Sequence, residues 1–229
     1  MKVVALVPIK LHSQRLPHKN ILNLGGKPLC YYMAKNLVSI DEIDETYVYC
    51  SDEQIIEYLP NGIRFLKRDP YLDGDLVKGQ EIYESFINKV DADIYVLAHV
   101  TAPFIKKDSI KNALNRVLAE EFDSALSVKK IQTFAWYKGN PLNYSLDNIP
   151  RTQDIESIYY ETSAFFIFKK EVFTEMGKRR IGKKPYFQEV DDIEAIDIDY
   201  PEDFKFAQTI INSINNGEEK IEVWKKKLK

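Results

Sequence analysis

The stretch VVALVPIKLHSQRLPHKN covers residues 3–20 and decides the fold. It opens with apolar, mostly β-branched residues, which are typical of a fully buried strand. The apolar run stops at Pro8, and three cations follow within twelve residues: Lys10, Arg15 and Lys19. Ligands of α/β proteins gather at the carboxyl ends of strands, so this basic loop is a candidate phosphate site. The alternative interpretation is a solvated basic loop with no ligand.

The composition is that of an ordinary globular protein with one domain, or one domain with a sizeable insertion. The chain has 229 residues, of which 45% are hydrophobic and 29% are charged. Its formal net charge of −3 argues against non-specific nucleic-acid binding. Any anion must therefore be held by a local cluster of cations.

The two cysteines, Cys30 and Cys50, lie in apolar patterns and suggest neither a disulfide framework nor a zinc site. They are interpreted as small core residues. No signal peptide is recognised, and no apolar run is long enough for a membrane span. We therefore expect a cytoplasmic protein that contacts neither membrane nor nucleic acid.

Strands and helices alternate along most of the chain. The predicted strands cover residues 3–8, 46–50, 64–66, 93–99, 124–129, 164–168 and 195–199. The predicted helices cover residues 29–38, 53–59, 78–88, 108–120, 170–176 and 202–214, and residues 215–229 are expected to form a peripheral helix or a frayed end. This rhythm predicts an α/β fold with right-handed crossovers and a mostly parallel sheet.

The alternation breaks between Ile131 and Glu161. This segment is rich in Tyr, Asn and Pro and is too long for an ordinary connection. It is predicted to carry hairpin or lid structure that serves a substrate or a partner subunit. A second irregular segment, Lys178 to Lys184, is strongly basic and is interpreted as a solvated turn.

Two carboxylates near the end of the chain, Asp197 and Asp199, are spaced to share one face of a short strand. Paired carboxylates suit Mg²⁺, which usually takes one or two of them together with substrate phosphates. The alternative is that Asp199 caps the helix that begins at Pro201. With the basic loop, the metal interpretation describes a nucleoside triphosphate pocket.

Several enzyme classes are excluded by missing motifs. The chain has neither the Gly-x-x-x-x-Gly-Lys-Ser/Thr of P-loop proteins nor a Gly-x-Gly-x-x-Gly after the first strand. It also lacks His-Glu-x-x-His and Gly-x-Ser-x-Gly, so neither a zincin nor an α/β-hydrolase is supported.

A set of short motifs in a fixed order resembles the acylneuraminate cytidylyltransferases, the CMP-sialic acid synthetase family. The motifs span residues 3 to about 211. They are Ser13-x-Arg15-Leu16-Pro17-x-Lys19-Asn20, Cys50-Ser51-Asp52, Arg68-Asp69-Pro70 with Leu72, Thr101 with Pro103, Arg151-Thr152-Gln153-Asp154 with Tyr159 and Glu161, and Asp197-Ile198-Asp199. Their order over the whole length is more specific than any single motif.

The resemblance implies a Rossmann-like three-layer sandwich that uses CTP and Mg²⁺ to activate an acidic sugar as its CMP derivative. It implies a single nucleotidyltransferase domain over residues 1–229, in a homodimer whose 131–161 insertion covers the partner's sugar pocket. Carried over residue by residue, the catalytic residues are Lys19, Arg15 and Asp199, and the nucleotide is held by Lys10, Ser13, Arg15, Lys19, Asn20 and Arg68. The sugar acid is held by His99, Thr101, Arg151 and Gln153, and the metal by Asp197 and Asp199.

The chain departs from the family pattern in four places. Lys10-Leu11-His12 stands where Arg-Gly-Gly is usual, Gln14 where a Lys is usual, His99 where a Gln is usual, and Thr162-Ser163 where Asn-Gly is usual. These departures leave open two alternatives: a cytidylyltransferase for another acceptor, such as a Kdo-like acid or a phosphonate, and an inactive nucleotide-binding relative. His99 is interpreted as a substrate contact or a general base near pH 7.

Overall fold

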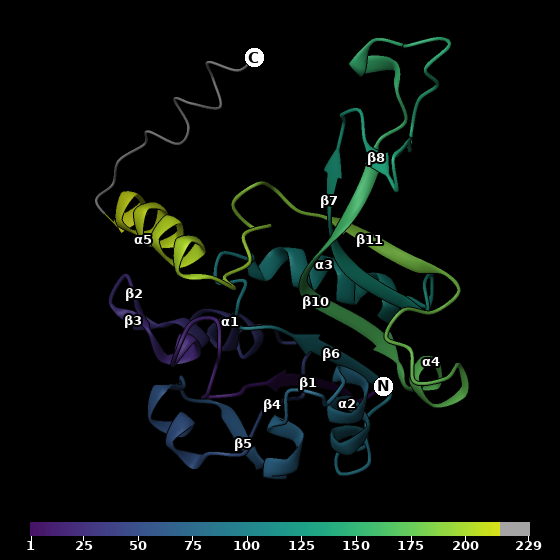
Figure 1. Cartoon of the computed structure of the whole chain (residues 1–229). Helices are drawn as coiled ribbons and strands as arrows, with labels where there is room; N and C mark the ends of the chain where they lie inside the picture. The colour runs from purple at the N-terminus through teal and green to yellow at the C-terminus, as the bar shows by residue number, and fades with distance from the viewer. Residues whose placement is uncertain (216–229) are drawn as a thin grey trace.

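A seven-stranded sheet forms the centre of the computed structural model, which describes residues 1–215 (Figure 1). Its strand order is β11-β7-β10-β6-β1-β4-β5. These strands are β1 (Val3–Pro8), β4 (Glu45–Cys50), β5 (Ile63–Lys67), β6 (Ile94–Ala98), β7 (Ser124–Ile131), β10 (Ile158–Lys169) and β11 (Pro185–Glu189). The helices are α1 (Leu29–Leu37), α2 (Gly79–Ile87), α3 (Lys107–Leu118), α4 (Lys170–Glu175) and α5 (Pro201–Asn215).

The first strand lies at the middle of the parallel part of the sheet. β1 pairs in parallel with both β4 and β6, and β4 pairs in parallel with β5. Only β10 runs antiparallel to its neighbours β6 and β7, because no packed crossover helix separates it from β7. The predicted mostly parallel sheet is confirmed.

The core has two apolar layers, one on each face of the sheet. Alternate residues of β1 divide between them: Val3, Ala5 and Val7 face the layer covered by α1 and α3, whereas Val4 and Leu6 face the layer covered by α2 and α4. This two-residue period explains why the whole strand reads as apolar. The fold is a three-layer α/β sandwich, as expected.

The segment 195–199 is not a strand, and this prediction is wrong. It passes over the carboxyl ends of the strands, where Ile198 N–H donates to the carbonyl of Thr101 at 2.9 Å. The sheet edge is instead occupied by β11, which the sequence analysis missed and which pairs in parallel with β7. The apolar–acidic alternation at 195–199 resembled a strand, but the segment has to reach α5 at Pro201. The helix predicted at 53–59 is confirmed, as a 3-10 helix over Glu53–Tyr58.

The irregular segment between β7 and β10 projects from the body of the molecule (Figure 1). It contains a short hairpin of β8 (Trp136–Tyr137) and β9 (Asn140–Pro141), so the predicted hairpin is confirmed. Large apolar side chains on it are exposed: Trp136, Tyr137, Leu142, Leu146 and Ile149. The β2 (Asn23–Leu24) and β3 (Lys27–Pro28) pair forms another small hairpin before α1.

Cys30 and Cys50 are both buried and unpaired in the core. Burial raises the pKa of the Cys30 thiol to about 12, so the thiolate is not available at neutral pH. Their interpretation as core residues is confirmed. No helix within residues 1–215 combines the length and the apolar character that crossing a bilayer requires. The expectation for the tail after residue 215 lies outside the described residues.

Candidate functional site

The loop after β1 is closed by contacts of its own residues. Leu11, which stands at a usual glycine position, is buried in the core beside β1. Neither Leu11 nor His12 has a positive φ, so this loop does not need glycine at those positions. At its far end, Asn20 Nδ2 donates to the carbonyl of Lys10 at 2.7 Å. The loop is therefore fixed at both ends by burial and hydrogen bonding.

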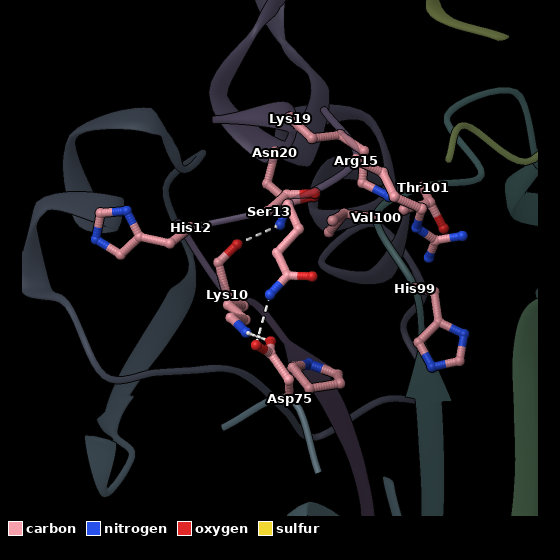
Figure 2. A pocket seen from close by; sticks show the side chains of 12 residues that line it. Lys10, His12, Ser13, Arg15, Lys19, Asn20, Asp75, His99, Val100 and Thr101 are labelled. Carbon is pink, nitrogen blue, oxygen red and sulfur yellow. Dashed lines mark hydrogen bonds and ion pairs between the residues drawn. The ribbon is translucent and has the colours of Figure 1, made fainter. Parts of the chain in front are cut away.

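A cavity of about 440 Å³ lies between this loop and the end of β6 (Figure 2). Seven of the residues expected at the site line it: Lys10, Ser13, Arg15, Lys19, Asn20, His99 and Thr101. They meet because β1 and β6 are parallel neighbours, and the segments after both strands leave the sheet at the same edge. Figure 2 shows His99 and Thr101 opposite Lys10 and Ser13 across this cavity.

Asp199 contacts two cations of the loop, Lys19 and Arg15. Lys19 is only 7% exposed, and its Nζ donates to Asp199 Oδ1 at 2.9 Å and to the carbonyl of Ile198 at 2.8 Å. Arg15 Nη1 lies 2.7 Å from Asp199 Oδ2, with its guanidinium over the ring of Tyr200. Partial burial opposes ionisation of Asp199, but the hydrogen bond and charge of Lys19, with the charge of Arg15, hold its pKa below the ordinary value.

The second carboxylate, Asp197, has a different environment. Desolvation, together with the negative charge of Asp199, raises its pKa above the ordinary value, although its side chain keeps contact with solvent. Within residues 1–215, no cluster of three or more His, Cys, Asp or Glu side chains could hold a metal ion by itself. Two carboxylates fit a Mg²⁺ ion that takes its other ligands from substrate phosphates and water.

His99 is held by an unusual turn of β10. Its Nδ1 lies 2.6 Å from the carbonyl of Ser163, and because a carbonyl only accepts, Nδ1 carries the proton and Nε2 is left with a lone pair. Ser163 has a φ of 58°, at the register shift between Glu161 and Phe166, in the place where the family pattern has glycine. Burial lowers the pKa of His99, and the charges of Arg180 and Lys19 act in the same direction. The imidazole is therefore neutral at pH 7.

Replacing His99 by Gln should flatten the acid side of the stability profile. The folded protein resists protonation of His99, whereas the unfolded chain takes up the proton as the pH falls through its ordinary pKa of about 6.5. The wild type should therefore lose stability between pH 7 and pH 5 by up to about 1.4 kcal/mol per pH unit more than His99→Gln. Urea unfolding at several pH values measures this difference. The matched control is His12→Gln, which removes an exposed imidazole; equal pH slopes for His99→Gln and wild type would contradict the prediction.

Arg68 takes a structural place beside the site rather than in its main cavity. It is only 2% exposed, forms an ion pair with Asp73, and donates from Nη2 to the carbonyl of Ile9 at 2.9 Å. Its guanidinium also lies 5.9 Å from the centre of the Tyr49 ring. These contacts fix the end of β1, from which the basic loop begins.

Arg151 and Gln153 are not brought to the cavity by this chain. Both are exposed on the projecting segment. Arg151 has a side-chain exposure of 79% and binds Asp154 through two hydrogen bonds, at 2.7 and 3.1 Å. The structure thus leaves these two expected sugar contacts apart from the other site residues.

Two residues at the site were not singled out from the sequence. Asp75 binds Lys10 Nζ at 3.0 Å and Gln14 Nε2 at 2.5 Å, and it lines the cavity. Arg180, in the segment interpreted as a solvated turn, lies with its guanidinium carbon 3.7 Å from the centre of the Phe166 ring. Neither contact has a local sequence signal, because both depend on segments that are far apart along the chain.

The geometry can be compared with known proteins. The family model described as Cytidylyltransferase matches residues 4–227, nearly the whole chain. The chain belongs to the cytidylyltransferase family. This result confirms the resemblance found in the ordered motifs.

Two curated relatives of this family member are similar over most of its length. An N-acylneuraminate cytidylyltransferase of Streptococcus agalactiae is 25% identical over 215 residues, covering 89% of this chain and 52% of the relative. A pseudaminic acid cytidylyltransferase of Campylobacter jejuni is 26% identical over 189 residues, covering 76% of this chain and 82% of the relative. The chain thus spans about half the length of the first of these relatives.

Solved structures of the same fold include a CMP:2-keto-3-deoxy-manno-octonic acid synthetase complexed with CTP. It superposes with a TM-score of 0.69 at 14% identity, covering 93% of this chain and 99% of that one. The 4-diphosphocytidyl-2C-methyl-D-erythritol synthase of Anaerococcus prevotii gives a TM-score of 0.66 at 13% identity, covering 92% and 96%. At these identities the likeness establishes the Rossmann-like α/β fold alone.

Proposed function

We propose that this chain is a CTP-dependent cytidylyltransferase that activates an acidic nine-carbon sugar as its CMP derivative and releases pyrophosphate. The observation that supports this most strongly is the convergence of Lys10, Arg15 and Lys19 with His99 on one cavity, in a member of the cytidylyltransferase family. The two curated relatives act, by their names, on N-acylneuraminate and on pseudaminic acid. Both are acidic nine-carbon sugars, so this is the acceptor class that we assign.

The reaction needs positioning and neutralisation of charge rather than a covalent protein intermediate. The anomeric hydroxyl of the sugar attacks the α-phosphorus of CTP in line, and the bond to the β-phosphate oxygen breaks as pyrophosphate leaves. Lys19 is the innermost cation, so it is assigned to the charge that develops on the reacting phosphate. Lys10 and Arg15, on the open side of the cavity, bind the outgoing phosphates, while Ser13 and Asn20 line the same loop.

A hydroxyl nucleophile must also lose its proton. His99 is suited to accept it, because its Nδ1 proton is committed to Ser163 and its Nε2 lone pair is free. Thr101, which lies beside it at the end of β6, lines the cavity and can bind a sugar hydroxyl. Arg68 contributes indirectly in this proposal, because it fixes the end of β1, where the basic loop begins.

The residues that would hold Mg²⁺ are Asp197 and Asp199. When bound, Mg²⁺ neutralises phosphate charge and polarises the reacting centre. Asp199 has a second task in this chain: its carboxylate orients Lys19 and Arg15 toward the same region. Ionisation of Asp199 therefore supports both the metal site and the placement of the two cations.

A homodimer is also proposed. The projecting segment carries five exposed large apolar side chains, which a second copy of the chain would cover. In such a dimer Arg151 and Gln153 would contact the partner's sugar pocket, since neither lies at the cavity of its own chain. Sedimentation that shows only monomer at micromolar concentration would contradict this. The use of CTP favours a cytoplasmic location.

The direct test of the function is pyrophosphate release from CTP and Mg²⁺ with a panel of acceptors. We expect turnover with at least one of N-acetylneuraminic, legionaminic and pseudaminic acids, and little with neutral sugars. Kdo and a phosphonate extend the panel to other acceptors of cytidylyltransferases. CTP binding without turnover on any acceptor would show that the chain is a nucleotide-binding relative and not an enzyme.

A further inference from the structure

A second hollow of the surface lies beyond His99 and is strongly basic. Its lining consists of Lys78, Gly79, Gln80, Tyr83, Lys178 and Arg180, so three of six residues are cationic and none is acidic. The first four residues lie at the beginning of α2, and Lys178 and Arg180 lie in the turn between α4 and β11. Two segments a hundred residues apart therefore supply cations to one place.

A third hollow shares lining residues both with this basic hollow and with the cavity of about 440 Å³ beside the basic loop, the nucleotide cavity. It has Pro8, Lys10, Asp75 and His99 in common with the nucleotide cavity, and Tyr83 in common with the basic hollow. His99 stands at the boundary. A ligand that reacts beside Lys19 and extends past His99 is therefore directed toward the basic hollow.

Arg180, a cation of the basic hollow, shares an aromatic neighbour with His99. Its guanidinium carbon is 3.7 Å from the centre of the Phe166 ring, and the His99 ring packs edge-on against the same Phe166 at 6.2 Å between centroids. Phe166 is fully buried in β10, so it gives the arginine a fixed support. The charge of Arg180 also acts on the pKa of His99, which agrees with this proximity.

The guanidinium of Arg180 has donors to spare. Among residues 1–215 its one carboxylate neighbour is the exposed Glu161, at 3.5 Å, and the Arg180 side chain is 33% exposed. Arg151, by contrast, is held by Asp154 through two hydrogen bonds, at 2.7 and 3.1 Å, on a segment away from the cavity. Lys178 is likewise engaged, by Glu84 at 2.7 Å. Arg180 is therefore available to a ligand anion without breaking a strong internal pair.

We propose that Arg180 binds the carboxylate of the sugar acceptor and so selects acidic over neutral sugars, with this cation supplied by the same chain that binds the nucleotide. In a 2-keto sugar acid the carboxylate is bonded to the carbon that bears the reacting hydroxyl. Its counter-charge must then lie close to the reacting centre, and Arg180, which packs with His99 against Phe166, is positioned to reach it. A guanidinium can bind a carboxylate through two parallel hydrogen bonds, which fixes the orientation of the sugar. This inference rests on the proposed function.

The test compares Arg180→Ala with two matched variants, using an acidic sugar that the wild type turns over. Arg180→Ala should raise KM for the sugar acid about ten- to a hundred-fold, as expected for loss of a charge-assisted hydrogen bond. KM for CTP should change less than about twofold, because Arg180 does not line the nucleotide cavity. Arg180→Lys should recover part of the loss. Arg179→Ala removes the neighbouring exposed charge and should behave as wild type.

The methyl ester of the same sugar shows which group Arg180 contacts. The wild type should prefer the acid strongly to the ester, whereas Arg180→Ala should lose most of this preference. An equal loss for acid and ester, or an unchanged KM for the acid, would overturn the inference. So would a loss of preference in Arg151→Ala with none in Arg180→Ala, which would assign the carboxylate to the projecting segment. If the wild type itself turns over no acceptor, the proposed function fails and this inference fails with it.

Discussion

Lys19→Gln should lower kcat by about two to three orders of magnitude, the usual effect of removing one preorganised group that stabilises transition-state charge. Lys19 is almost fully buried, and its ammonium is directed by Asp199 and by the carbonyl of Ile198. Glutamine retains a donor, one atom closer to the backbone, but carries no charge. The loss should therefore appear in kcat more than in KM, because the charge that it neutralises develops during the reaction.

The control for this prediction is Lys10→Gln, which removes the same charge from the open side of the same loop. Lys10 is paired with the exposed Asp75, so Lys10→Gln should mainly raise KM for CTP. Circular dichroism and thermal unfolding should show that Lys19→Gln is folded, since Asp199 keeps Arg15 as its partner. A kcat for Lys19→Gln within a factor of about three of the wild type would contradict the role assigned to it.

The parts of the fold that were predicted correctly are those with strong local patterns. β1 and β6 are continuous apolar runs, and α3 and α5 have regular apolar periods, so each follows from its own residues. The parallel order then follows from the alternation of strands with helices. β11 was missed because it is a short edge strand that directly follows the basic turn, and its pairing with β7 determines its conformation more than its sequence does.

The residues of the candidate site likewise divide into those that could be predicted from the sequence and those that could not. The residues of the basic loop lie within eleven positions of one another, so their meeting was predictable from the sequence. His99 and Thr101 were predictable from the resemblance, and the parallel pairing of β1 with β6 brings them to the loop. Arg180 and Asp75 were not predictable, because a stacking contact on Phe166 and an ion pair with Lys10 require the folded arrangement of distant segments.

The strand predicted at 195–199 shows how a wrong local structure can still give a correct grouping. The prediction placed Asp197 and Asp199 on one strand face, but the segment is a loop. Asp199 nevertheless reaches Lys19 and Arg15, because the loop crosses the carboxyl ends of the strands, with Ile198 fixed by Thr101. The two carboxylates differ in environment, since the pKa of Asp197 is raised and that of Asp199 is lowered. Asp199 is the one committed to the cations.

Asp199→Asn should reduce Mg²⁺-dependent turnover by about three orders of magnitude or more, a larger effect than that of Lys19→Gln. The substitution removes an assigned metal ligand. It also removes the carboxylate that orients Lys19 and Arg15. Both effects act on the same charged reaction centre, so they should multiply. The fold should persist, because Asp199 is partly exposed and Asn is nearly isosteric with Asp.

A Mg²⁺ titration at saturating CTP separates the two contributions of Asp199. Loss of a metal ligand shifts the half-saturating Mg²⁺ concentration upward, whereas loss of cation placement lowers the maximal rate at saturating Mg²⁺.

Asp203→Asn is the matched control, because it removes a nearby charge. The asparagine carbonyl can still accept the hydrogen bonds that the backbone N–H groups of Asp199 and Tyr200 donate to Asp203 at 3.0 and 2.8 Å. This variant should retain most activity. Turnover near wild type for Asp199→Asn, with the Mg²⁺ dependence unchanged, would show that Asp199 serves neither the metal nor the cations. A lowered plateau with an unchanged Mg²⁺ midpoint would show that Asp199 positions only the cations. Asp197 would then be the metal ligand to substitute next.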